Sequence, residues 1–452
     1  MKIRITLERS LIAAIAAAAL HSGSAGAADL LEVYNDAKAH DAAYAAARAA
    51  REAGQEKLAQ GRAGILPTLN LSAATSRTSL DARYDPPFVP LVPPIDRRHF
   101  VASGYALMFT QPLFRRQNFI EYTEADYLVQ QSEAAFGAAG QDLILRVAQT
   151  YFEVLAAADS LALVQAQKAA IAEQLAQAKK NFEVGTTTIT DTHEAQARYD
   201  LITAQEITAQ SELDLRRRAL TQLTGKTYDK LQPLRDGLTL TGPNPDKLES
   251  WLTLGENQSY AVVAQQAQVE LQALEVKRNN AGHYPTLDFV AAYGSVDQTG
   301  TVLTAVGSRA STGIVGLQFN LPLYSGGAVS SRTREAAALL ERARADLDNV
   351  RRQQALAVQQ FFVGVASGIN QVRALEQAQI SSETALASNR LGYEVGVRVN
   401  IDLLNAQQQV YSTRRELAAA RYNVILNQLR LKAAVGALGE PDLEEVDRAL
   451  TP

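Results

Sequence analysis

The chain has 452 residues, of which 47% are hydrophobic, 20% charged and 6% aromatic, with no cysteine and a formal net charge of −4. Without cysteine there is no disulfide scaffold, thiolate metal site or cysteine nucleophile, and the five histidines never pair at the spacing of metal ligands. The weak negative charge gives no support to nucleic-acid binding. We therefore expect no metal, no cofactor and no nucleic-acid partner.

The N-terminus has the three parts of an export signal. Met1–Arg4 is basic, Leu11–Leu20 is apolar, and Ala25-Gly26-Ala27 is a small-x-small cleavage sequence. An apolar run of about ten residues is too short to span about 30 Å of hydrocarbon. Residues 1–27 are therefore predicted to be a secretory signal peptide. Because no later run of about 20 apolar residues exists, we expect no transmembrane helix, and membrane insertion only as a β-barrel.

Four segments alternate between bulky apolar residues and small or polar ones. In the second, Val101, Tyr105, Leu107 and Phe109 share one face. Runs of about ten such residues are typical of transmembrane β-strands, although a strand of a soluble sandwich alternates identically. Four strands cannot enclose a lumen, since about eight are needed. The chain is therefore predicted to pool strands with other copies, and this argument does not choose a dimer over a trimer. The expected strands are at about 66–79, 100–113, 284–297 and 311–324.

Two long stretches lack proline, the strongest helix breaker. One lies between Pro112 and Pro233 and the other between Pro322 and Pro441, and both are rich in helix-forming residues. In the second stretch, apolar residues recur every seven positions, which predicts a seam against a partner helix. These are Leu403, Val410, Leu417, Val424 and Leu431. Each stretch is predicted to be a hairpin of two long helices, at about 116–224 and 328–436.

The two halves of the chain repeat each other. Phe182-Glu183-Val184-Gly185 returns as Tyr393-Glu394-Val395-Gly396, and the proline and glycine positions agree across the halves. The two Val-Gly turns, at Gly185 and Gly396, are where the helices of each hairpin are expected to meet. We infer a tandem duplication, with a first repeat at 28–237 and a second at 238–452 that ends in a short C-terminal segment. The proline-rich segments 85–95 and 233–245 are predicted to be a surface loop and a linker.

These features together resemble the TolC family of outer-membrane exit ducts, over about Asp29 to Val435. The most specific matches are the segments 392–406, 420–423 and 427–429. The resemblance implies a mainly α-helical protein with a membrane β-barrel: a homotrimer with a 12-stranded barrel, four strands per protomer, and a long periplasmic coiled-coil tunnel. A mixed belt would be built from about Lys226 to Leu254 and the segments flanking Ala28 and Pro441.

The function that this resemblance implies is passive transport. The trimer would sit in the lipid of the outer membrane of a Gram-negative bacterium and extend into the periplasm. It would form the exit duct of tripartite efflux pumps, of type I protein secretion, or of both. The implied partners are a periplasmic adaptor (membrane fusion) protein and an inner-membrane efflux pump or ABC exporter.

The resemblance also places a periplasmic gate at the two Val-Gly turns. It implies that Tyr393 bonds Asp191 within a protomer, while Arg398 reaches Thr190 and Asp191, partly across the protomer boundary. Asp402 would point into the lumen as one member of a three-fold acidic ring. The residue types suit these roles, because a guanidinium binds a carboxylate strongly and a ring of carboxylates attracts cations.

The sequence departs from the family pattern at two gate positions. The second lumen aspartate of the family falls at Asn405, which halves the charge of the ring. A family glutamate falls at Arg390, so the expected bond with Gln174 would run from the guanidinium to the amide oxygen. Both changes make the expected gate less acidic.

Other interpretations stay open at this point. Asn400 is a good N-cap residue, and Asp402 and Asp191 occupy positions that a helix N-terminus favours in any protein. The chain as a whole is alternatively a soluble periplasmic coiled-coil adaptor or a structural spacer of the periplasm. An enzyme is not expected, since the sequence has no nucleophile elbow, phosphate loop or dinucleotide fingerprint.

Overall fold

The computed structural model describes residues 27–83, 95–235 and 237–451. The predicted signal peptide, apart from Ala27, and all of the predicted proline-rich loop except Ile95 lie outside the described residues. The chain divides into two compact units. Of the described residues, one unit contains 47–83, 95–137 and 260–353, and we call it the sheet unit. The other contains 27–46, 138–235, 237–259 and 354–451, and we call it the hairpin unit.

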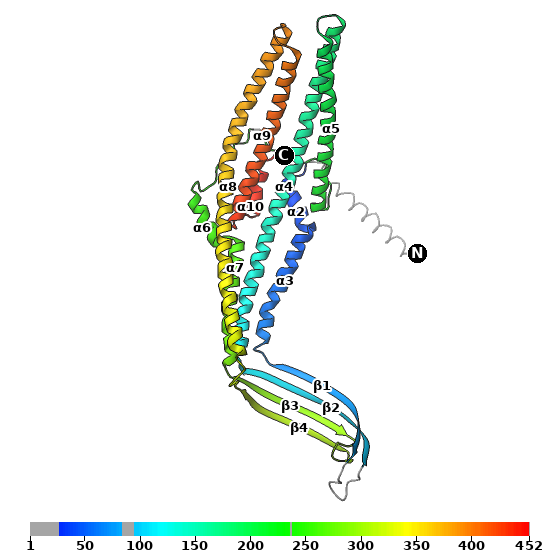
Figure 1. Ribbon diagram of the computed structural model, residues 1–452, viewed down its shortest axis with the longest axis vertical. Helices are drawn as coiled ribbons and strands as arrows, with labels where there is room; N and C mark the ends of the chain where they lie inside the picture. The colour runs from blue at the N-terminus through cyan, green and yellow to red at the C-terminus, as the bar shows by residue number, and fades with distance from the viewer. Residues whose placement is uncertain (1–26, 84–94, 236, 452) are drawn as a thin grey trace, which may run out of the picture. The chain divides into compact units, whose positions relative to one another are not determined.

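A single antiparallel sheet dominates the sheet unit, with its strands in the order β1-β2-β3-β4 (Figure 1). The first two strands are longer than the sequence pattern indicated, because they pair without interruption from Thr68 opposite Thr110 to Arg83 opposite Ile95. The last strand stops short of Pro322, which has no N–H to donate to the ladder. The strands are β1 (Thr68–Arg83), β2 (Ile95–Phe114), β3 (Thr286–Gln298) and β4 (Ser308–Asn320).

Within the described residues, the last strand of the sheet has no covering layer. Every residue of β4 is exposed, including Val315, Leu317 and Phe319 on its bulky face. Within the sheet, β1 and β4 each pair on one side only. A sheet with two free edges and exposed apolar side chains is stable neither in water nor in lipid unless further strands complete it.

An ion pair marks the point where strand turns to helix. Arg115, between β2 and α4 (Arg116–Glu183), donates two hydrogen bonds of 2.7 Å to the two carboxylate oxygens of Asp288 on β3. The Asp288 side chain is only 7% exposed. Because a bidentate guanidinium–carboxylate pair fixes both distance and angle, it sets where α4 begins relative to the sheet.

Helices pack closely in the rest of the sheet unit. It contains most of α3 (Ala42–Ala63), all of α7 (Tyr260–Asn280), the short η1 (Ala281–His283), and the first parts of α4 and α8 (Ala328–Glu394). At Gly137 on α4 a Cβ atom would lie 2.5 Å from the ring of Tyr260, so only glycine permits this approach. The first part of α4 is thereby held against α7.

The hairpin unit contains the two long helical hairpins and a mixed region beside them. α4 is followed by α5 (Ile189–Thr224), and α8 by α9 (Asn400–Ala434), and Figure 1 shows each second helix returning alongside the first. The seam predicted from the seven-residue period is confirmed, since all five residues from Leu403 to Leu431 are at most 4% exposed. At Gly368 a Cβ atom would lie 2.8 Å from the Val424 side chain, so α8 and α9 approach closely.

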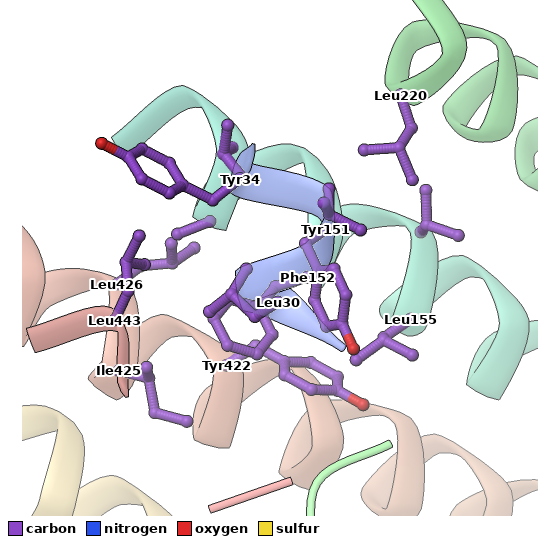
Figure 2. Packing of buried hydrophobic residues seen from close by; sticks show 14 of the residues in the cluster. Leu30, Tyr34, Tyr151, Phe152, Leu155, Leu220, Tyr422, Ile425, Leu426 and Leu443 are labelled. Carbon is purple, nitrogen blue, oxygen red and sulfur yellow. The ribbon is translucent and has the colours of Figure 1, made fainter. Parts of the chain in front are cut away.

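The core of the hairpin unit joins segments from both repeats (Figure 2). It brings together α2 (Leu30–His40), α4, α9 and α10 (Glu440–Asp447). Tyr151 and Phe152 of α4 contact each other edge to face, and the Phe152 ring lies 5.4 Å from that of Tyr422 on α9. Ala28 forms a bridge with Leu231, and the Tyr151 hydroxyl donates to the Gln232 carbonyl at 2.9 Å. The remaining helix of this unit is α6 (Leu248–Gln258).

One window of α4 is apolar enough, by length and composition, to cross a membrane, and 44% of that window is buried within the chain. The core helix of a soluble protein passes the same test. In α4 the apolar residues Leu143, Val147 and Tyr151 are fully buried in the core just described. Packing within the chain therefore accounts for part of the apolar composition of this helix.

Candidate functional site

The first hairpin turn is closed by its own side chains. Gly185, after the end of α4, has a φ of +79°, which favours glycine, and the Thr186 amide bonds back to Asn181 at 2.9 Å. Thr188 is the N-cap of α5, and it forms a reciprocal capping box with Asp191. The turn is therefore fixed at both helix ends by local bonds.

Asp191 is occupied within this turn. Its Oδ2 atom accepts hydrogen bonds from the Thr187 hydroxyl, from the Thr188 hydroxyl at 3.0 Å and from the Thr188 amide at 3.2 Å. The bond from Thr187, followed by those from Thr188, lowers the pKa of Asp191 below its ordinary value, although partial burial opposes this. The interpretation of Asp191 as a helix-capping residue is thereby confirmed.

The second hairpin turn has the same backbone course and different bonds. Gly396 has a φ of +77°, and the Val397 and Arg398 amides both donate to the Gly392 carbonyl. The N-cap of α9 is Val399, which offers no side-chain acceptor. The prediction of Asn400 as the N-cap is wrong: it is the first helical residue, it is 3% exposed, and its amide donates to the Asp191 carbonyl at 3.4 Å. Burial against the other hairpin takes this side chain away from the helix end.

The predicted latch residues lie at the two turns but bond elsewhere in this single chain. Arg398 faces Asp402 across one helical turn, with 3.5 Å between Nη1 and Oδ2, and both side chains are substantially exposed. Exposed pairs of this kind contribute little to stability. Among the described residues, no hydrogen bond joins Tyr393 to Asp191 or Arg398 to Thr190 or Asp191. The latch stays a prediction.

The second expected contact is likewise not formed within the described residues. Arg390 lies 3.5 Å from Glu394, one turn along its own helix, and is 75% exposed. Gln174 is 8% exposed, and its Oε1 atom is buried without a hydrogen-bond partner in the described part of the chain. A buried acceptor without a donor is unfavourable, so Gln174 is still a site where a donor would bind.

The bonds that join the hairpins to each other leave no sign in the sequence pattern. Arg198 on α5 donates to Asn405 at 2.9 Å and to Gln408 at 2.8 Å, both on α9. Asn405, predicted as a member of the lumen ring, is therefore tied to the first repeat. Nothing in the local sequence around Arg198 indicates a partner more than 200 residues away.

Comparison with known proteins agrees with this architecture. The sequence profile of the family described as outer membrane efflux protein matches residues 33–226 and 252–437. The outer membrane protein TolC of Vibrio cholerae serotype O1 is 32% identical over 431 residues, which cover 95% of each chain. The chain belongs to the outer membrane efflux protein family. Another relative, the alkaline protease secretion protein AprF of Pseudomonas aeruginosa, is 33% identical and covers 92% of this chain and 86% of its own.

Solved structures show the same fold for this outer membrane efflux protein. The outer membrane protein VceC of Vibrio cholerae superposes with a TM-score of 0.74 at 20% identity, covering 90% of this chain and 96% of its own. The expected TolC-like fold, mainly helical with four barrel strands per protomer, is confirmed, as is the outer-membrane location. The alternative of a soluble periplasmic adaptor is wrong, because the chain belongs to the outer membrane efflux protein family.

Proposed function

We propose that the chain forms the outer-membrane exit duct of an export machine, as a homotrimer whose 12 strands close one barrel. The observation that carries this proposal is the four-stranded sheet with two free edges and exposed apolar side chains. Three copies would pair β4 of one protomer with β1 of the next and leave no edge. The α4–α5 and α8–α9 hairpins would then line up around a tunnel.

Transport through this duct would be passive. The chain would supply a water-filled path, and energy would come from an inner-membrane efflux pump or ABC exporter, reached through a periplasmic adaptor. AprF carries protease secretion in its name, and the family description is efflux, so both kinds of export stay within this proposal. No catalytic residue is required for such a conduit.

The gate of the duct would lie at the two hairpin turns. Arg398 and Asp402 are exposed and only loosely paired, which leaves both free to find partners on a neighbouring protomer. In the trimer, Arg398 and Tyr393 would link the turns, and three Asp402 carboxylates would form the acidic ring. The belt and the two repeats at 28–237 and 238–452 would hold these turns at the end of the tunnel.

Purified trimers in planar bilayers test this gate. The double variant Arg398→Ser, Tyr393→Phe should raise resting conductance several-fold, because it removes the links between turns. Asp402→Ala should relieve block by multivalent cations without that rise in conductance. Unchanged conductance in the first variant would remove the latch, and unchanged block in the second would remove Asp402 from the ring. Failure to recover heat-modifiable trimers from the outer-membrane fraction would contradict the duct itself.

A further inference from the structure

Arg198 joins the first hairpin to the second through side-chain hydrogen bonds near the turns. It lies on α5, and its two terminal nitrogens donate to side-chain amide oxygens on α9: Nη2 to Asn405 at 2.9 Å and Nη1 to Gln408 at 2.8 Å. The acceptors are one helical turn apart, so the planar guanidinium bridges them as a fork. Such a fork fixes the distance and the angle between the two helices.

The contact lies over a small apolar joint. Ile202, one turn after Arg198, and Leu404, next to Asn405, are 2% and 3% exposed and pack together with Val164 of α4. A hollow of only about 50 Å³ remains between these helices. Arg198, Gln408 and Arg415 are among the residues that line it. The hydrogen bonds of Arg198 at the rim of this joint add to the larger core around Phe152 and Tyr422, which joins the same two hairpins further from the turns.

The chemistry of the contact suits a clamp that can open. Hydrogen bonds from a charged donor are stronger than those between neutral groups. The acceptors, however, are amides, so no ion pair has to be broken when the hairpins separate. Gln408 and Asn405 are exposed, and water can replace the guanidinium there at modest cost.

We propose that Arg198 clamps the two hairpins of one protomer together and thereby opposes opening of the duct. The proposal rests on the gate proposed above and adds to it a residue outside the two turns. It also gives Asn405 a role: this position holds the second hairpin to the first instead of adding charge to the lumen.

Conductance in planar bilayers gives the first test. Arg198→Gln should raise resting conductance several-fold, whereas Asn405→Asp should lower it, because an ion pair would then replace the hydrogen bond to a neutral amide. Arg415→Gln is the matched control: it removes an arginine from the same hollow, and Arg415 makes no hydrogen bond among the described residues. Equal conductance in Arg198→Gln and Arg415→Gln would overturn the clamp.

The distance between the hairpin tips gives a second test that does not depend on conduction. The chain has no cysteine, so spin labels attach only at Val184→Cys and Val397→Cys, which are 73% and 78% exposed. In sparsely labelled trimers, Arg198→Gln should broaden the distance distribution within a protomer, and Arg415→Gln should leave it unchanged. An unchanged distribution in Arg198→Gln would overturn the clamp.

The two tests separate failure of the clamp from failure of the gate. If Arg398→Ser, Tyr393→Phe raises conductance and Arg198→Gln changes neither readout, the clamp is wrong and the gate stands. In the opposite case, Arg198→Gln changes both conductance and the distance distribution, and Arg398→Ser, Tyr393→Phe leaves conductance unchanged. The clamp then stands, and the latch at the turns is wrong.

Discussion

The two hairpin turns follow the same backbone path, but different bonds hold them. In the first turn, Thr188 and Asp191 cap α5 reciprocally. In the second, α9 begins without a side-chain cap, Asn400 is buried against the other hairpin, and Arg398 and Asp402 form only a long exposed pair. In the first turn the carboxylate therefore caps its own helix, whereas in the second turn the charged side chains are free to change partners.

The helices that lead to the turns differ in a similar way. Near the start of α4, Glu124 is 9% exposed, and its Oε1 atom lies 3.7 Å from Nε of Arg278. Burial, opposed by the Arg278 charge and assisted by Glu275 and Glu121, raises its pKa to about 7. Near the start of α8, Glu335 is exposed. The duplication therefore preserved the helices but not their electrostatic environment, and three pairs of variants measure how far the repeats have diverged.

The largest effect is expected from Glu124→Gln, on the pH dependence of stability. Because the pKa of Glu124 is raised from 4.5 to about 7, the folded state binds this proton more tightly than the unfolded state. The free energy of unfolding should therefore fall by about 3 kcal/mol as pH rises from about 4.5 to about 7, and stay level above. Glu124→Gln should remove this slope in denaturant titrations at pH 5, 6, 7 and 8. Glu335→Gln is the exposed control. If the free energy of unfolding had the same slope with pH in both variants, the two glutamates would not differ in environment.

A smaller effect is expected at the caps. Asp191→Ala should cost about 1 kcal/mol of local stability at the start of α5, because the cap and the bonds to Thr187 and Thr188 are lost. Asp402→Ala should cost less than about 0.5 kcal/mol at the start of α9, where no cap exists. Hydrogen exchange of the first-turn amides measures both. Since the pKa of Asp191 is lowered, protection at α5 should persist as pH falls to the ordinary value of 3.8 and be lost below it. If both variants lost the same local stability, the two turns would not differ in how their helices are capped.

The turn glycines should behave alike. Gly185 and Gly396 have φ angles of +79° and +77°, and at neither would a Cβ atom meet any neighbour within 4 Å. Alanine at either position should therefore cost about 1 kcal/mol, from backbone strain alone. The measurement is the same hydrogen exchange at the flanking helix ends. If the two alanine variants lost very different amounts of stability, the backbone conformation, and not only the side-chain bonding, would differ between the repeats.

Much of the fold was predictable because it rests on local periodicity. Alternation of period two gave the strands, proline-free stretches gave the four long helices, and the seven-residue period gave the buried seam from Leu403 to Leu431. Strand ends were less predictable, because β1 and β2 extend as far as their mutual pairing continues. At the candidate site, the sequence identified both turns and left capping open as one of two roles for Asp191, and the structure shows the cap.

What the sequence by itself determined is therefore the set of elements and the need for partner strands, since these follow from residue spacing within one segment. Only the tertiary structure decided that Asn400 turns to Asp191, that Arg198 holds Asn405, and that Glu124 is buried while Glu335 is exposed. The physical reason is that hydrogen-bond partners and burial depend on contacts between segments distant in the sequence. Two repeats with the same periodicity can therefore differ in their bonds.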